Sequence, residues 1–151
     1  MRQSRYNFLA MPIAPVRLLI VYHPKAEGAP AAAQAMADFC AQHGSLDIHL
    51  LAFDEAEVRA QVAGQDVLVV LGGDGSMLRA GRVAAPHGIP VLGVNLGRLG
   101  FLAEVQPDEW REVLNRVLAG DYWIEERMML RVEHWREGRL LSAHDGLNEA
   151  V

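Results

Sequence analysis

The chain has 151 residues, 51% of them apolar and 22% charged, which suits one globular domain with a buried core. A net charge of −5, an isoelectric point near 5.6 and the lack of any basic run argue against a nucleic-acid partner. No apolar run in the sequence reaches the length of a membrane span, so we expect no membrane partner.

The N-terminal residues 1–15 include basic residues but no continuous apolar segment, so they do not predict a signal peptide. We interpret them as a disordered extension, with Met1 or Met11 as the native start. The single cysteine, Cys40, falls at an apolar position of a predicted helix and cannot form an internal disulfide. We therefore expect a buried structural thiol in a cytoplasmic protein, rather than a nucleophile.

Residues 16–120 alternate between aliphatic runs and segments with helical spacing of apolar residues. The aliphatic runs predict strands at 16–22, 46–53, 66–71 and 90–94. The helical segments lie at 30–42, between Asp54 and Gly64, at 76–85 and at 106–119. Asp54 is expected to cap its helix. This alternation predicts an α/β fold, a Rossmann-like parallel sheet with flanking helices on both faces.

The pattern changes near residue 121. Residues 123–135 and 139–151 are typical of two long antiparallel strands, joined by a turn at Arg136, Glu137 and Gly138. We interpret the large apolar side chains of this segment as packing residues rather than as a cofactor-binding motif, namely Trp123, Met128, Met129 and Trp135. Two strands alone bury too little surface to be stable. We therefore predict an α/β domain at 16–120 and the first strands of an incomplete all-β domain at 121–151.

A glycine-rich turn, GGDGS at 72–76, follows the third predicted strand. It should lie at the carboxyl edge of the sheet, where open α/β folds bind ligands. Gly72 and Gly73 can adopt positive φ and allow backbone N–H groups to approach an anion, and a helix starting at Ser76 would direct its positive end toward the same space. In the alternative interpretation, the turn is purely structural and Asp74 or Ser76 caps the helix.

Two familiar phosphate-binding motifs do not fit this turn. The third glycine of a dinucleotide fingerprint would fall on Leu78, and a Walker loop would need a lysine that is absent here. The six histidines are scattered without the spacing of metal ligands, so we predict no metal site made by the protein alone.

Two further polar segments are candidates for a site. NLGRLGF at 95–101 offers an asparagine at a strand end, Arg98 and the aromatic Phe101, or else forms a compact loop that returns Phe101 to the core. Near the C-terminus, Asn148 and Glu149 stand side by side on a predicted strand. The alternative there is a hairpin turn at Asp145–Gly146 followed by a polar edge strand.

Taken in order, GGDGS at 72–76, NLGRLGF at 95–101 and Asn148–Glu149 resemble the hallmark motifs of the NAD kinase family. ERMML at 126–130 also resembles the family's run leading into its β domain. The resemblance covers residues 16–151, about the first half of a family member. It implies a phosphofructokinase-like N-terminal domain, followed by the start of a β-rich domain that binds NAD.

This resemblance implies transfer of the γ-phosphoryl group of ATP, or of polyphosphate, to the adenosine 2′-hydroxyl of NAD. Mg²⁺ accompanies the nucleotide and the product is NADP. Asp74 matches the residue that accepts the hydroxyl proton. The positions implied to bind the nucleotides are Gly72, Gly73, Gly75, Ser76, Arg79, Asn95, Phe101, Asn148 and Glu149. Arg79, one turn into its helix, could reach back toward an anion or simply lie on a solvated helix face. The family also implies a homo-oligomer, a dimer or tetramer.

The sequence departs from the family pattern in two ways. Ser76 replaces the usual threonine but keeps the hydroxyl, and the family's second Gly/Thr-rich motif is absent after residue 149. We therefore expect residues 1–151 alone to be weakly active or inactive. Two alternatives stay open, a non-catalytic nucleotide-binding module and a related GGDG-type lipid kinase. The second is disfavoured by NLGRLGF, by Asn148–Glu149 and by the lack of a membrane-facing amphipathic stretch.

Overall fold

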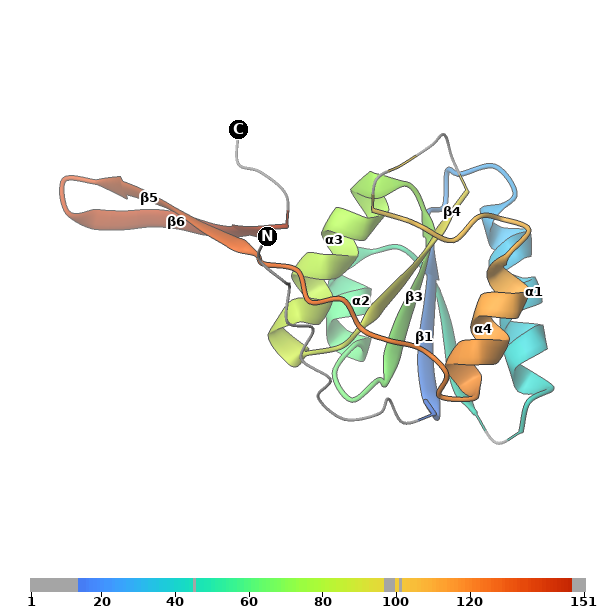
Figure 1. Cartoon of the computed structure of the whole chain (residues 1–151). Coiled ribbons are helices and arrows are strands. Elements are labelled where there is room, and N and C mark those ends of the chain that lie inside the picture. Colours follow the sequence, from blue (N-terminus) through green and yellow to red (C-terminus); the bar gives the residue numbers. More distant parts are fainter. Residues whose placement is uncertain (1–13, 45, 97–99, 101, 148–151) are drawn as a thin grey trace, which may run out of the picture.

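The parallel sheet predicted from the sequence is present. A computed structural model describes residues 14–44, 46–96, 100 and 102–147 of the chain. Its 4-stranded parallel sheet has the order β2–β1–β3–β4 (Figure 1). The strands are β1 (Arg17–Tyr22), β2 (Asp47–Ala52), β3 (Val67–Gly72) and β4 (Val91–Asn95). The α/β fold class is therefore confirmed.

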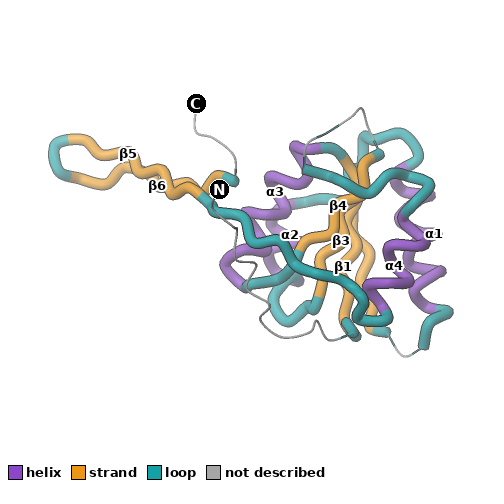
Figure 2. The backbone as a smooth tube through the Cα atoms, viewed as in Figure 1, coloured by secondary structure: helices purple, strands orange, loops and turns teal. Residues whose placement is uncertain are grey.

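Helices cover both faces of this sheet, as the alternation predicted (Figure 2). One face packs against α1 (Ala29–Ala41) and α4 (Trp110–Leu118), and the other against α2 (Glu55–Gln61) and α3 (Asp74–Ala84). A short 3₁₀ turn, η1 (Ala85–His87), follows α3. The central strands are apolar throughout because successive side chains enter opposite layers. Leu18 and Leu19, for example, are both 0% exposed and belong to different layers.

Cys40 lies on α1 inside the layer formed with α4, and it is fully buried. Burial raises the pKa of its thiol to about 11. The side chain therefore stays a protonated thiol at neutral pH and acts as a small core residue. This agrees with the expectation of a structural cysteine.

The helix starts are partly as expected. Asp54 caps α2, since its carboxylate accepts hydrogen bonds from the backbone N–H groups of Ala56 and Glu57 at 3.0 and 3.1 Å. The start expected at residue 106 is wrong, because α4 begins at Trp110. The preceding residues form a turn in which the Glu109 carboxylate accepts from the N–H of Gln106 at 3.1 Å. Proline and the acidic residues thus lie just ahead of the helix.

Strand order places a topological switch point between β1 and β3. From β1 the chain passes through α1 to β2 on one side, and β3 then pairs with the other side of β1. The loops that follow β1 and β3 therefore leave the carboxyl edge in different directions. In open α/β sheets this is where ligands bind.

After α4 the chain forms a hairpin that projects from the α/β body (Figure 1). Its strands, β5 (Leu130–Arg136) and β6 (Arg139–Gly146), are antiparallel. The turn lies where the sequence placed it. Its central residues, Glu137 and Gly138, have φ values of 49° and 73°. Positive φ at both positions is the geometry of a type I′ hairpin turn.

Two expectations about this region are wrong. The first strand begins at Leu130 rather than at residue 123, because residues 123–129 have no neighbouring strand to pair with among those described. A turn at Asp145–Gly146 is also excluded, since both residues pair with β5. Two of the large apolar side chains of this segment lie on the surface of the described chain, with Trp123 69% exposed and Met128 80% exposed.

Candidate functional site

The GGDGS turn lies at the switch point and is very short. β3 ends at Gly72, Gly73 is the N-cap, and α3 begins at Asp74, two residues earlier than expected. Neither Gly72 nor Gly73 has the positive φ that glycine allows. The interpretation of Asp74 or Ser76 as a cap is wrong. Gly73 occupies the cap position in an extended conformation, with no side-chain cap hydrogen bond.

Gly72 is required by close packing rather than by backbone conformation. A Cβ atom at this position would collide with the Ser76 hydroxyl and lie 2.8 Å from the Ser76 Cβ. Ser76 itself is only 3% exposed. In contrast, a Cβ at Gly73 or at Gly75 would meet no described residue within 4 Å, the backbone of α3 itself left aside. Among the described residues, the turn therefore packs tightly on one side and is open on the other.

Asp74 joins the two glycine-rich turns. Its side chain is half-buried, and Oδ1 accepts a hydrogen bond from the backbone N–H of Leu102 at 3.0 Å. Gly100 lies so close that a Cβ there would collide with the same carboxylate oxygen. The carboxylate that opens α3 is thus held against the end of the second turn.

The second turn also begins against the first. Asn95, the last residue of β4, is 2% exposed, and its N–H donates to the carbonyl of Val105 at 2.8 Å. The next N–H, of Leu96, donates to the carbonyl of Gly72 at 3.2 Å. The starts of the two glycine-rich turns, which are more than 20 residues apart in the sequence, are therefore adjacent at the carboxyl edge of the sheet.

Arg79 lies back along α3 toward the turn. Its Nε approaches the carbonyl oxygen of Gly75 at 3.5 Å, and its guanidinium sits 5.1 Å from the centroid of the Phe53 ring. Contact with the face of the Phe53 ring keeps the Arg79 guanidinium near the N-terminal turn of α3. This is the direction in which the sequence suggested it could reach.

Sequence reasoning missed the loop that follows β1. The N–H of His23 donates to the carbonyl of Leu71 at 2.9 Å, and a Cβ on Gly72 would lie 3.6 Å from the His23 Cβ. His23 Nδ1 accepts in turn from the N–H of Lys25, the single lysine of the chain, at 3.1 Å. The signal was the position of both residues directly after a buried strand. Only the strand order shows that this strand neighbours β3.

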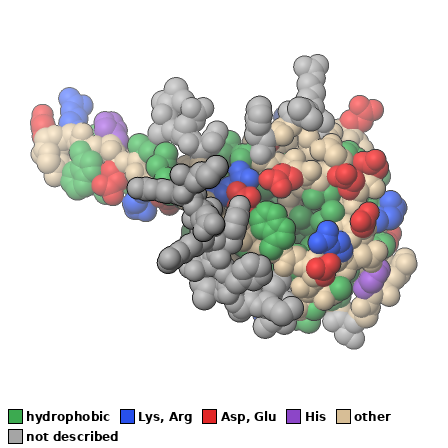
Figure 3. All heavy atoms as spheres, viewed as in Figure 1, with side chains coloured by type: hydrophobic (Ala, Val, Ile, Leu, Met, Phe, Trp, Pro, Cys, Tyr) green, Lys and Arg blue, Asp and Glu red, His purple; other side chains and the backbone are tan. Residues whose placement is uncertain are grey.

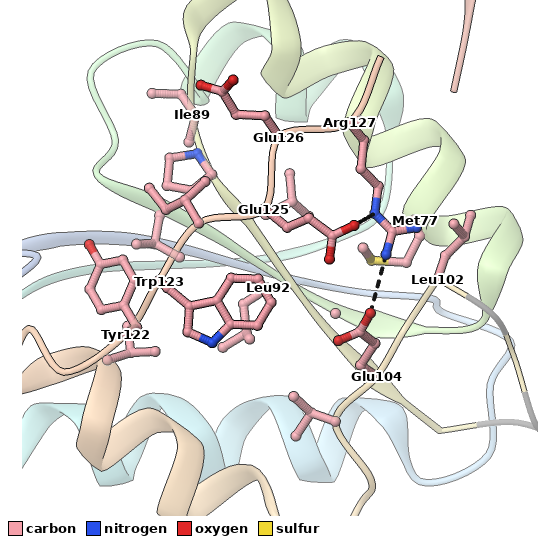
Figure 4. A pocket seen from close by; sticks show the side chains of 18 of the residues that line it. Met77, Ile89, Leu92, Leu102, Glu104, Tyr122, Trp123, Glu125, Glu126 and Arg127 are labelled. Atoms are coloured by element: carbon pink, nitrogen blue, oxygen red, sulfur yellow. Dashed lines mark hydrogen bonds and ion pairs between the residues drawn. The ribbon is translucent and has the colours of Figure 1, made fainter. Parts of the chain in front are cut away.

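An open groove of about 820 Å³ runs along the outer side of β4 (Figure 4). It extends from Met77 and Leu102, near Asp74, to Tyr122 and Trp123 in the segment after α4. Arg127 crosses it and forms ion pairs with Glu104 at 3.2 Å and with Glu125 at 3.1 Å. The lining is mainly apolar, and the charged side chains of Glu104, Glu125 and Arg127 within it are paired with one another.

Several candidate residues lie outside the described residues. Phe101, Asn148 and Glu149 belong to this group, together with Arg98. Within the described ranges, no three His, Cys, Asp or Glu side chains gather in a way that could hold a metal ion. These same ranges contain no helix long and apolar enough to cross a membrane.

The fold and the site define a doubly wound α/β domain in which two glycine-rich turns meet at the switch point of the sheet. A solved structure of yeast NADH kinase complexed with NADH has the same fold. The two chains superpose with a TM-score of 0.64 at 20% sequence identity, over 87% of this chain and 46% of the yeast chain.

The sequence comparisons identify the family. The family model of the ATP-NAD kinase N-terminal domain matches residues 31–122, more than half of the chain. A curated NAD kinase of Heliobacterium modesticaldum is 53% identical over 95 residues, which are 63% of this chain and 34% of the relative. One of Chloroflexus aurantiacus is 36% identical over 135 residues, 89% of this chain and 49% of the relative. The chain belongs to the NAD kinase family, as its motifs indicated, and it spans about half the length or less of these curated relatives.

Proposed function

We propose that the full-length protein is an NAD kinase, which transfers the γ-phosphoryl group of ATP to the adenosine 2′-hydroxyl of NAD and forms NADP. The observation that carries this proposal is the position of Asp74. Its carboxylate lies at the switch point of the sheet and is oriented by the Leu102 N–H, between the two glycine-rich turns. Family membership supplies the substrates, since the relatives are named as NAD kinases.

Asp74 would act as the proton acceptor. In phosphoryl transfer the protein mainly positions the reacting groups and stabilises the charge of the transition state, and it forms few covalent bonds itself. A sugar hydroxyl is a weak acid, so its proton need leave only as the new P–O bond forms. The hydrogen bond from the Leu102 N–H to Oδ1 orients the carboxylate of Asp74.

The open side of the turn would hold the phosphates of the donor. The first N–H groups of a helix have no partner within that helix and carry partial positive charge. In α3 they follow Gly73, which carries no side chain. Arg79, held on Phe53 and directed toward Gly75, would add positive charge on the same side. His23 and Lys25 follow the neighbouring strand and are further candidates for donor contacts.

The family also implies Mg²⁺. Proteins usually bind this ion through one or two carboxylates together with substrate phosphates. The described residues form no cluster that fits a resident metal ion, and we therefore derive no step through it. In this proposal the ion arrives with the phosphates of ATP. Use of polyphosphate, assembly as a dimer or tetramer and a cytoplasmic location stay predictions from the sequence.

The hairpin would be the start of the domain that binds NAD. Its apolar side chains are largely exposed, as expected if more polypeptide covers them in the whole protein. Asn148 and Glu149, which immediately follow the described part of the hairpin, would grip NAD near its ribose, and Phe101 would line the adenine site. On this proposal residues 16–120 supply Asp74 and the donor loop, and residues 1–151 alone form little or no NADP.

The test uses the full-length gene product with ATP, Mg²⁺ and NAD, and detects NADP by mass spectrometry. We expect wild-type turnover and a loss of about 10²- to 10⁴-fold for Asp74→Asn, because the amide cannot accept the proton. Equal turnover by the variant would contradict the role of Asp74. Nucleotide binding without any product from the wild type would instead favour the non-catalytic binding module.

A further inference from the structure

We propose that Gly100 is a positioning residue for Asp74, and that its lack of a side chain sets the orientation of the carboxylate. This inference rests on the proposed function, because it assigns Gly100 a part in placing the proton acceptor. The two residues belong to different glycine-rich turns, and they meet only because those turns share the carboxyl edge of the sheet.

Among the described residues, the closest contacts of a Cβ at Gly100 are all with the carboxyl group of Asp74. A Cβ atom at this position would collide with Asp74 Oδ1 and lie 3.1 Å from Cγ and 3.4 Å from Oδ2. These three atoms are the nearest neighbours of such a Cβ, so a methyl group at position 100 would displace or rotate the carboxylate.

The closeness of the two residues gives one physical reason for a glycine at this position. What the position requires is empty space next to Asp74. Two residues later, the N–H of Leu102 donates to the same Oδ1 atom at 3.0 Å. Gly100 and Leu102 therefore fix the carboxylate, the first by close contact and the second by a hydrogen bond.

The first experiment is a kinetic cycle in the full-length protein. We expect Gly100→Ala to lower kcat on the order of 10- to 100-fold, because small misplacements of a catalytic group have effects of that size. The KM for ATP should change little, since the donor side of the turn is untouched. Gly81→Ala is the matched control. It makes the same change on α3, where the added Cβ would meet only Leu147 at 3.6 Å, and it should leave kcat unchanged.

The cycle is completed in the Asp74→Asn background. If Gly100 acts through Asp74, adding Gly100→Ala to Asp74→Asn lowers kcat by less than about twofold further, because the positioned group is already lost. An equal fold-loss in both backgrounds would show that Gly100 acts elsewhere and would overturn the proposal.

A second measurement does not depend on kinase activity. The collision with Asp74 should lower the thermal unfolding temperature of Gly100→Ala, and removing the carboxylate in Asp74→Ala/Gly100→Ala should restore at least half of the loss. No restoration would overturn the proposal even if Gly100→Ala is poorly active. A wild-type protein that makes no NADP but shows this restoration would contradict the proposed function while supporting the contact between the two residues.

Discussion

The α/β body and the β5–β6 hairpin contain similar apolar residues, but these side chains are buried in the body and exposed in the hairpin. In the body, Leu68 on β3 is fully buried, whereas in the hairpin Leu141 on β6 is 49% exposed. Hydrophobic side chains lie on the surface along the projecting hairpin, which no other described layer covers (Figure 3). The difference is in the neighbours, because a strand is buried only where another layer packs on its face.

This comparison separates local structure from burial. The hairpin forms from its turn and its cross-strand pairing, without a core. The body has helices on both faces, and its rigid sheet holds the two glycine-rich turns against each other at Asp74. Together with the groove beside β4, the hairpin forms a surface that further polypeptide could cover.

The largest expected effect comes from matched leucine truncations in the two regions. In the 151-residue chain, Leu68→Ala should lower the free energy of unfolding by about 2–5 kcal/mol, because it leaves a cavity in the core. Leu141→Ala should change it by less than about 0.5 kcal/mol, because the side chain is half in solvent. Urea unfolding followed by circular dichroism measures both.

The same pair sharpens the comparison in the full-length protein. If further polypeptide covers the hairpin, Leu141→Ala should there cost more than about 1 kcal/mol, while the effect of Leu68→Ala should be unchanged. A negligible effect of Leu141→Ala in both proteins would show that the hairpin stays exposed, and the proposed β-rich domain would then need another explanation.

A smaller, pH-dependent effect is expected at the amino edge of the sheet. Asp66 Oδ2 accepts from the N–H groups of Val16 and Arg17 at 2.9 and 2.8 Å, tying the residue before β3 to the start of β1. Burial acts to raise the pKa of Asp66, but these hydrogen bonds and the Arg17 charge outweigh it and hold the pKa below its ordinary value. The partly exposed ion pair itself should add little.

We therefore expect Asp66→Ala to cost about 1–2 kcal/mol of unfolding free energy at pH 7. A lowered folded-state pKa stabilises the fold above the unfolded-state pKa of about 3.9, and this contribution disappears as the pH falls through the folded-state value. Urea titrations from pH 7 to pH 3 should show wild type and variant converging below about pH 4. A difference that stays constant over this range would mean that the carboxylate charge does not contribute, and Asp66→Asn serves as the uncharged control.

The sequence predicted the body well because each signal there is local. Aliphatic runs and helix-end residues such as Asp54 placed the elements to within a few residues. Strand order is not local, so the loop with His23 and Lys25 was missed although it lies beside Gly72.

The sequence identified residues of the candidate site, but it did not show which atoms those residues contact. The partner of Asp74 is a backbone N–H 28 residues away, which no spacing rule could supply. The close packing of Gly72 was missed for a related reason, since its contact with Ser76 depends on how α3 sits on β3. In the hairpin, the expected strand from residue 123 was too long because the sequence does not say where a pairing partner is present.

The smallest expected effect tests whether the hairpin is stabilised locally. Among the described residues, Glu137 is the only one other than glycine with positive φ, 49°, a conformation that is costly for most side chains and tolerated by asparagine. Glu137→Asn creates the Asn–Gly pair preferred in type I′ turns and should stabilise the hairpin on the order of 0.5 kcal/mol. Hydrogen exchange of the paired β5–β6 amides should slow, with no change in β3. Glu137→Ala, which keeps the strain, should give no gain. Slower exchange in β3 as well would show that the hairpin and the body are energetically coupled, because stabilising the turn would then stabilise the core.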